Sequence, residues 1–197
     1  MIINIATDDS EAADDGKRPE QGGNGEPGSL TDPATLAKRG DIEATTATFE
    51  HDGADHCEAE AGGRAVVGVT NDAGEVLLWV HDAGHAVLPN VVVDAGDDWA
   101  RAARGAVADA AGVALELDGV ERVREVEHVL AADRDASDAC ELETTYHVVF
   151  AATATDESGD GVEARGDAWT AGWYDRLPAA NTGERSVDAD VRLFLDT

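Results

Sequence analysis

Lysine is nearly absent from this chain of 197 residues, in which only Lys17 and Lys38 occur. Aromatic residues are also scarce, at 5%, and there is a single Met. Acidic residues are abundant: 42 Asp and Glu stand against 14 Lys and Arg, which gives a formal net charge of -28. No basic patch offsets this charge, and such a surface repels nucleic acid phosphates and anionic membranes. We therefore expect neither nucleic acid nor a membrane as a partner.

Long apolar runs and cysteines are missing or rare as well. No apolar run approaches the roughly 20 residues that a membrane span needs, and the first residues, MIINIATDDSEAADD, lack the basic region of a signal peptide. The two cysteines, Cys57 and Cys140, fit a reducing compartment. These absences predict a cytoplasmic protein.

The acidic residues are spread along the whole chain, and the hydrophobic fraction of 43% is ordinary for a globular protein. At molar salt the Debye length falls to about 3 Å, so that dense surface carboxylates barely repel one another. The composition therefore indicates a halophilic protein and resembles that of salt-accumulating archaea. An acidic protein from a low-salt organism, with an acidic tail, is the alternative.

Residues 1–40 are rich in Gly, Asp, Glu and Pro and have few large apolar side chains. Such a segment cannot bury enough surface to offset its ordering entropy, so a disordered leader is predicted there. One domain is expected over 41–197. Its first strand candidate, 44–52, alternates only weakly, and a loop is nearly as good an interpretation.

Periodic apolar residues predict the other elements. A β-hairpin is expected over 64–84, because two apolar runs flank the turn residues 71–74, Asn-Asp-Ala-Gly. A closing helix is expected at 188–196, capped by Asp188 or Ser186. Further strands are predicted at 85–96 (broken at Pro89), 120–130, 144–154 and 168–178. This order of elements indicates the α+β class, with a mixed β-sheet between helices.

The segment 97–112, DDWARAARGAVADAAG, predicts an amphipathic helix over 98–111. Asp97 or Asp98 suits its N-cap and Gly112 its C-terminal end. Apolar residues recur with helical spacing at Trp99, Ala102, Ala103, Ala106, Val107 and Ala110. That stripe predicts a helix packed on the sheet, with few acidic residues in a very acidic chain.

Together with the residues before it, this helix resembles the Nudix box. The box is written G-x5-E-x7-R-E-U-x-E-E-x-G-U, where U is a bulky apolar residue, and it is matched by LPNVVVDAGDDWARAARGAVADAAGV at 88–113. AGWYDRLP at 171–178 also looks like a Nudix strand end, and the resemblance covers residues 64–196. It implies a Nudix-type α/β/α sandwich. It also implies hydrolysis of a nucleoside diphosphate linked to another moiety, with Mg²⁺ or Mn²⁺ as cofactor.

The residues at the two ends of segment 88–113 are those of the box, but most of its charged residues are not present. Gly105 and Ala106 stand in place of the Arg-Glu pair, and Val91 stands in place of the leading Gly. Of the Glu-Glu pair, Asp109 keeps the first carboxylate and Ala110 replaces the second. Positions 106, 109 and 110 share one helix face, where three carboxylates would hold divalent ions. Two of the three positions here carry methyl groups, which indicates a degenerate site.

Two hypotheses follow. In the first, hydrolysis survives or is weakened, with Asp109 as the catalytic residue and the metal held by Asp109, Asp97 and Asp167. In the second, the domain is catalytically inactive and binds a nucleotide-like ligand or a protein partner. In either case Trp79 and Trp169 are candidates for stacking on a nucleobase, although core packing is the first interpretation of both.

Other motifs give weaker indications of a functional site. Residues 156–167 match a calcium loop at several places, but they lie between predicted strands and end in Asp167 where Glu is preferred. His51, His56 and Cys57 match no standard zinc spacing. His85 or His147 could contact a substrate, although an ordinary surface or core histidine is the better interpretation of each.

Overall fold

The computed structural model describes residues 28–51, 61–130, 144–155, 168–179, 181 and 185–195. The elements in these ranges, in chain order, are α1 (Pro33–Leu36), β1 (Glu43–His51), β2 (Ala61–Thr70), β3 (Val76–His81), β4 (Ala86–Val87), β5 (Asn90–Asp94), α2 (Trp99–Ala111), β6 (Leu115–Leu130), β7 (Thr145–Ala154), β8 (Trp169–Tyr174) and α3 (Ser186–Val191). None of the helices in the described ranges is long and apolar enough to cross a membrane.

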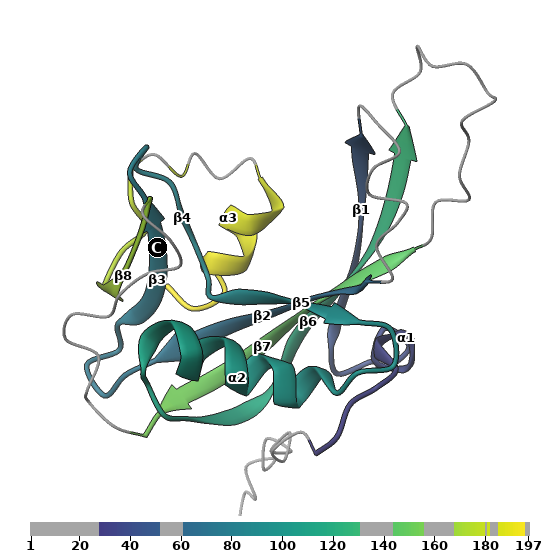
Figure 1. The fold of residues 1–197 in the computed structure, drawn as a ribbon, viewed down its shortest axis with the longest axis horizontal. Helices are drawn as coiled ribbons and strands as arrows, with labels where there is room; N and C mark the ends of the chain where they lie inside the picture. Colours follow the sequence, from purple (N-terminus) through teal and green to yellow (C-terminus); the bar gives the residue numbers. More distant parts are fainter. Residues whose placement is uncertain are drawn as a thin grey trace, which may run out of the picture.

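The strands form one mixed sheet in the order β1-β6-β7-β2-β3-β4, with β5 paired to β2 and β8 paired to β3 (Figure 1). The pairs β1·β6 and β2·β7 are parallel, and the other pairs are antiparallel. Of the weakly alternating segment at 44–52, residues 44–51 therefore lie in strand β1, which pairs in parallel with β6 at one edge of the sheet, and residue 52 lies outside the described part.

Helices cover both faces of this sheet. Successive side chains of a strand point to opposite faces, so that one strand contributes apolar side chains to the core on each face. Val67 of β2 and Phe150 of β7 pack in one buried cluster with Trp99 of α2. Val66 of β2 packs in a second cluster with Val191 of α3. Figure 1 shows α2 and α3 on opposite sides of the sheet. The predicted α+β class and the α/β/α sandwich that the resemblance implies are confirmed.

Helix α2 has the ends that the sequence predicts, and Trp99, Ala103 and Val107 of its predicted apolar stripe are buried, whereas Ala102 and Ala106 are half-buried. The Asp98 carboxylate accepts hydrogen bonds from the N–H groups of Ala100 (3.1 Å) and Arg101 (3.3 Å), which caps the first turn. Gly112 ends the helix in the left-handed conformation, with φ of 60°, and its N–H donates to Ala108. Val107 and the indole of Trp99 are almost completely buried against the sheet.

The hairpin at 64–84 needs a correction. Its turn is present, since Asn71 Oδ1 accepts hydrogen bonds from the N–H groups of Ala73 and Glu75. However, β2 and β3 are in register only at the pair Thr70 and Val76. Beyond that pair β2 continues against β5 and β7, and β3 continues against β4 and β8. The long β2·β3 ladder that was expected is thus reduced to one pair, and the longest ladders of these two strands are β2·β7 and β3·β8.

The ends of the chain also differ from the sequence predictions. The predicted disorder of residues 1–40 does not extend over helix α1, whose Leu36 is buried, while residues 1–27 lie outside the described part. Helix α3 begins at Ser186 and ends at Val191, short of the expected 196. Asp188 lies inside this helix, where its carboxylate accepts from the N–H of Arg185, so that Arg185 is the N-cap residue.

Candidate functional site

The segment that resembles the box, residues 88–113, forms β5, the loop that follows it, the helix α2 and the turn at its C-terminal end. Pro89 sits just before β5, and its carbonyl accepts a hydrogen bond of 2.9 Å from the N–H of Val67. At the other end Val113 is buried in the main core. The Asp98 carboxylate also accepts from the N–H of Leu30 (3.2 Å), which ties the segment before α1 to the helix. The frame of the box is thus built as the sequence predicts.

The residues at positions 105 and 106, where the box has its Arg-Glu pair, have small side chains in this helix. Ala106 is half-buried on α2, and a side chain at Gly105 would meet no neighbouring atom within 4 Å. The helix therefore has room for a larger residue at 105. Packing around the Cβ position does not explain why a glycine stands there.

The predicted metal ligands are only partly described by the structure. Asp97 is exposed in the turn before α2, where its N–H donates to the carbonyl of Asp94 at 3.1 Å. The backbone of Asp109 lies in α2, but its side chain is not among those described, and Asp167 lies outside the described ranges. Within those ranges, no group of three or more His, Cys, Asp or Glu side chains could hold a metal ion. The described residues do not fit a Mg²⁺ or Mn²⁺ site.

The two tryptophans proposed for stacking differ in their surroundings. Trp79 is only 3% exposed and packs in the main core, which corrects the suggestion that it stacks on a ligand, since a nucleobase needs an open ring face. Trp169 is half-buried and lies against two imidazoles. Its ring centroid is 4.9 Å from that of His81 and 5.3 Å from that of His85, both in edge-to-face geometry.

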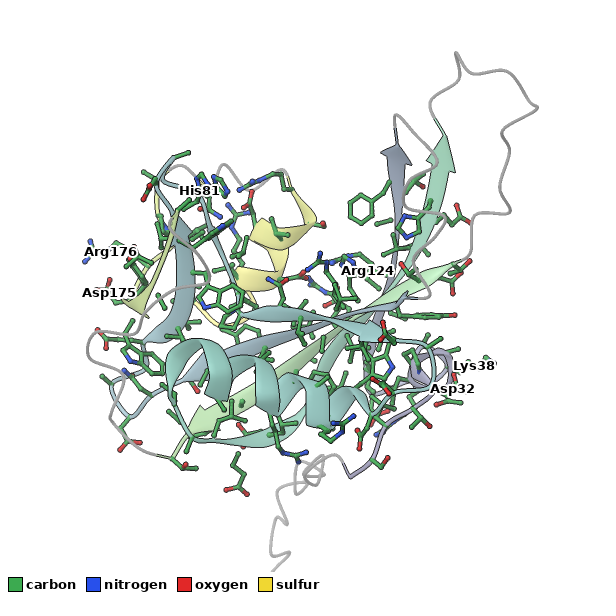
Figure 2. The ribbon with its side chains drawn as sticks, in the orientation of Figure 1. Asp32, Lys38, His81, Arg124, Asp175 and Arg176 are labelled. Carbon is green, nitrogen blue, oxygen red and sulfur yellow. The ribbon has the colours of Figure 1, made fainter. Side chains whose placement is uncertain are left out.

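Arginines of β6 make buried ion pairs that the sequence did not reveal. Asp190 of α3 accepts from Arg122 (2.8 Å) and from both terminal nitrogens of Arg124 (2.6 and 3.0 Å). Arg122 also donates to the Glu43 carboxylate of β1 from Nε (3.1 Å) and from a terminal nitrogen (2.8 Å). These bonds hold α3 over the face of the sheet opposite α2, and Figure 2 shows Arg124 between α3 and β1.

His147 of β7 lies next to these arginines. Burial lowers its pKa, and the nearby charges of Arg124 and Arg64 lower it further, to about 4, although the carboxylate of Asp190 acts in the opposite direction. At neutral pH its imidazole is therefore uncharged. The sequence named His147 as a residue that could contact a substrate, but it gave no signal that two arginines flank it.

Comparisons with known proteins give a likeness to solved structures alone. No protein-family model matches the chain, and no curated protein matches it. The chain is similar to an ADP-ribose pyrophosphatase from Streptococcus suis, with 15% identity and a TM-score of 0.42 over 68% of this chain and 89% of that one.

Two further solved structures are similar at the same level. The E. coli dihydroneopterin triphosphate pyrophosphohydrolase has 14% identity and a TM-score of 0.43, over 70% of this chain and 97% of that one. A Bacillus subtilis pyrophosphohydrolase has 14% identity and a TM-score of 0.38, over 70% of this chain and 78% of that one. All three TM-scores lie below 0.5, and the function proposed for this chain rests on its own residues.

Proposed function

We propose that this chain is a Nudix-type domain that binds a nucleotide-like ligand, a nucleoside diphosphate linked to another moiety, and hydrolyses it weakly or not at all. One observation carries the proposal: an intact loop–helix frame, capped at Asp98 and Gly112, holds Gly105 and Ala106 at positions that need Arg and Glu. A frame that keeps its loop and helix but only Asp109 of the three helix carboxylates can still shape a ligand site. The described residues supply no group of three carboxylate, imidazole or thiol side chains that could hold a divalent ion, which supports weak or lost hydrolysis.

Restoring the carboxylates of the helix tests the proposal. Isothermal titration of the unmodified protein with Mg²⁺ or Mn²⁺ is expected to show no tight binding. The double variant Ala106→Glu with Ala110→Glu is expected to gain measurable affinity, because residues 106, 109 and 110 share one face of α2. The matched control is Arg101→Gln with Ala108→Glu, which changes the net charge equally at two exposed positions of the same helix.

Hydrolysis is assayed in parallel at high salt with nucleoside diphosphate sugars as substrates. The unmodified protein is expected to bind a member of this panel and to release little product. Rapid metal-dependent hydrolysis that collapses in Asp109→Asn would overturn the proposal, since the chemistry of the box would then survive with fewer carboxylates. Failure to bind any nucleoside diphosphate would overturn its binding part.

We also infer that the protein works in the cytoplasm of a cell that accumulates salt. The net charge of -28 supports this inference, because carboxylates at that density repel one another strongly unless molar salt screens them. The site is therefore best assayed in molar KCl.

A further inference from the structure

Three side chains form a row across the sheet on the face opposite α2. In the parallel register of β2 and β7, Arg64 stands beside His147. In the antiparallel register of β6 and β7, His147 stands opposite Arg124. Residues paired in this way point to the same face of a sheet. The row therefore places a guanidinium group on each side of one imidazole.

Neighbouring residues hold both guanidinium groups in place. Asp190 accepts two hydrogen bonds from the terminal nitrogens of Arg124, whose side chain is 4% exposed. Arg64 donates to the amide oxygen of Asn90 at 2.7 Å, and Asn90 in turn donates to the carbonyl of Leu88 at 2.9 Å. Donors fixed before a ligand arrives lose little conformational entropy when they bind it. Arg64 and His147 are only partly buried, so a ligand can reach them.

The electrostatic potential along this row favours an anion. Burial is the main cause that lowers the pKa of His147, and the charges of Arg124 and Arg64 each act on the imidazole more strongly than the opposite charge of Asp190 does. A neutral imidazole still offers one N–H donor. Guanidinium groups match the oxygens of a phosphate through paired N–H donors. In a chain of net charge -28, such a spot suits an anionic group specifically.

We propose that Arg64 and His147 bind a phosphate group of the ligand, on the face of the sheet opposite α2, and that the buried Arg124 adds its positive charge beside them without contacting the ligand. The inference rests on the proposed function, because a nucleoside diphosphate supplies the anion. It adds a binding site outside the helix of the box. Asn90, which positions Arg64, directly precedes Val91 at the first position of the box segment. A ligand held at the row would therefore lie beside the first residue of β5, the strand that precedes the loop to α2.

Inorganic pyrophosphate is the probe, titrated calorimetrically into the full chain in molar KCl. Arg64→Gln is expected to weaken its binding about tenfold or more, because a hydrogen bond to a charged group is lost. Arg101→Gln is the matched control: it removes the same charge from an exposed position of α2 and is expected to leave the affinity unchanged. Equal weakening in both variants, or no binding of pyrophosphate to the unmodified protein, overturns the inference.

A second measurement reads the site directly and does not depend on a variant folding. An NMR titration of the histidine rings, with and without pyrophosphate, is expected to raise the pKa of His147 from about 4, because a bound anion favours the charged imidazole. The charged and titratable groups near His147 are Arg124, Arg64, Asp190 and His128. His81 serves as the reference, since it lies at the end of β3, well away from Arg124 (Figure 2). An unchanged His147 titration in the presence of bound pyrophosphate overturns the inference.

Adenosine diphosphate separates this inference from the proposed function. Binding of adenosine diphosphate that Arg64→Gln does not weaken keeps the proposed function and overturns the phosphate site. Pyrophosphate binding that Arg64→Gln weakens, with no binding of any nucleoside diphosphate, keeps the phosphate site and overturns the proposed function.

Discussion

His147 makes the folded chain sensitive to acid. Its pKa is lowered to about 4 in the folded protein by burial, Arg124 and Arg64, and its ordinary value is 6.5. The folded state therefore favours the neutral imidazole, whereas the unfolded chain takes up a proton as the pH falls through 6.5. Stability that is fully present above pH 6.5 is lost progressively as the pH falls toward 4.

His147→Gln is expected to lose less stability over that interval than the unmodified protein. The measurement is the free energy of unfolding in denaturant at pH 7 and at pH 5. Carboxylates titrate in both proteins, so the difference between the two isolates the imidazole. The same loss in His147→Gln and in the unmodified protein would contradict the prediction.

Single residues of the candidate site were predictable where the signal lies within one segment. The end residues and the replaced positions of α2 could be identified because helix spacing fixes which positions share a face. The pairing of Arg124 with Asp190 could not be found that way, since the two residues lie 66 positions apart. One signal was present: Arg122, Arg124 and His128 alternate along β6 in a chain with few cations, which predicts that they share a face.

Gly105 and Gly63 give opposite predictions for the same substitution. Gly105→Ala is expected to stabilise the protein by about 0.5–1 kcal/mol, because Gly is a poor helix residue and an added Cβ meets nothing within 4 Å. Gly63→Ala is expected to destabilise it by more than about 1 kcal/mol. Gly63 has φ of +144°, and its added Cβ would collide with the carbonyl oxygen of Tyr146.

Thermal or denaturant unfolding of the two variants, side by side with the unmodified protein, measures both effects. A destabilised Gly105→Ala variant would contradict the prediction. It would show that position 105 needs the conformational freedom of a glycine, although this residue lies within the regular helix α2. A neutral Gly63→Ala variant would show that β2 and β7 can separate slightly without cost.

Helices and strands that are determined by residues close in sequence were predictable, and pairings that depend on distant residues were not. Helix α2 follows from its caps and its apolar stripe, and β7 from clear alternation. The split of β2 from β3 was not predictable, because the remainder of that edge of β2 is taken by β5, whose pairing residues lie roughly 30 positions further along the chain than those of β2. In β6, two register shifts against β7 break the simple alternation, and Arg122, Val123 and Arg124 are all buried. Alternation alone assigns such residues to opposite environments.

The whole molecule is expected to depend on salt. With 42 acidic and 14 basic residues, repulsion among surface carboxylates destabilises the fold when it is unscreened. Thermal unfolding is therefore expected at a clearly higher temperature in molar KCl than in dilute buffer. Molar sucrose in dilute buffer is the control, since it favours compact states without screening charge. Equal or higher stability at low salt would contradict the halophilic interpretation.

The ion pairs between β6 and α3 respond to salt differently from that surface. The side chains of Asp190, Arg122 and Arg124 are 4%, 10% and 4% exposed, so dissolved ions do not come between them. Dilution should therefore loosen the acidic exterior and leave this junction intact. Partly unfolded molecules at low salt would then keep α3 docked on the sheet, and amide hydrogen exchange would be slowest at this junction. The junction of β6 and α3, whose charged side chains are almost inaccessible to solvent, would then be the last part of the fold to unfold on dilution.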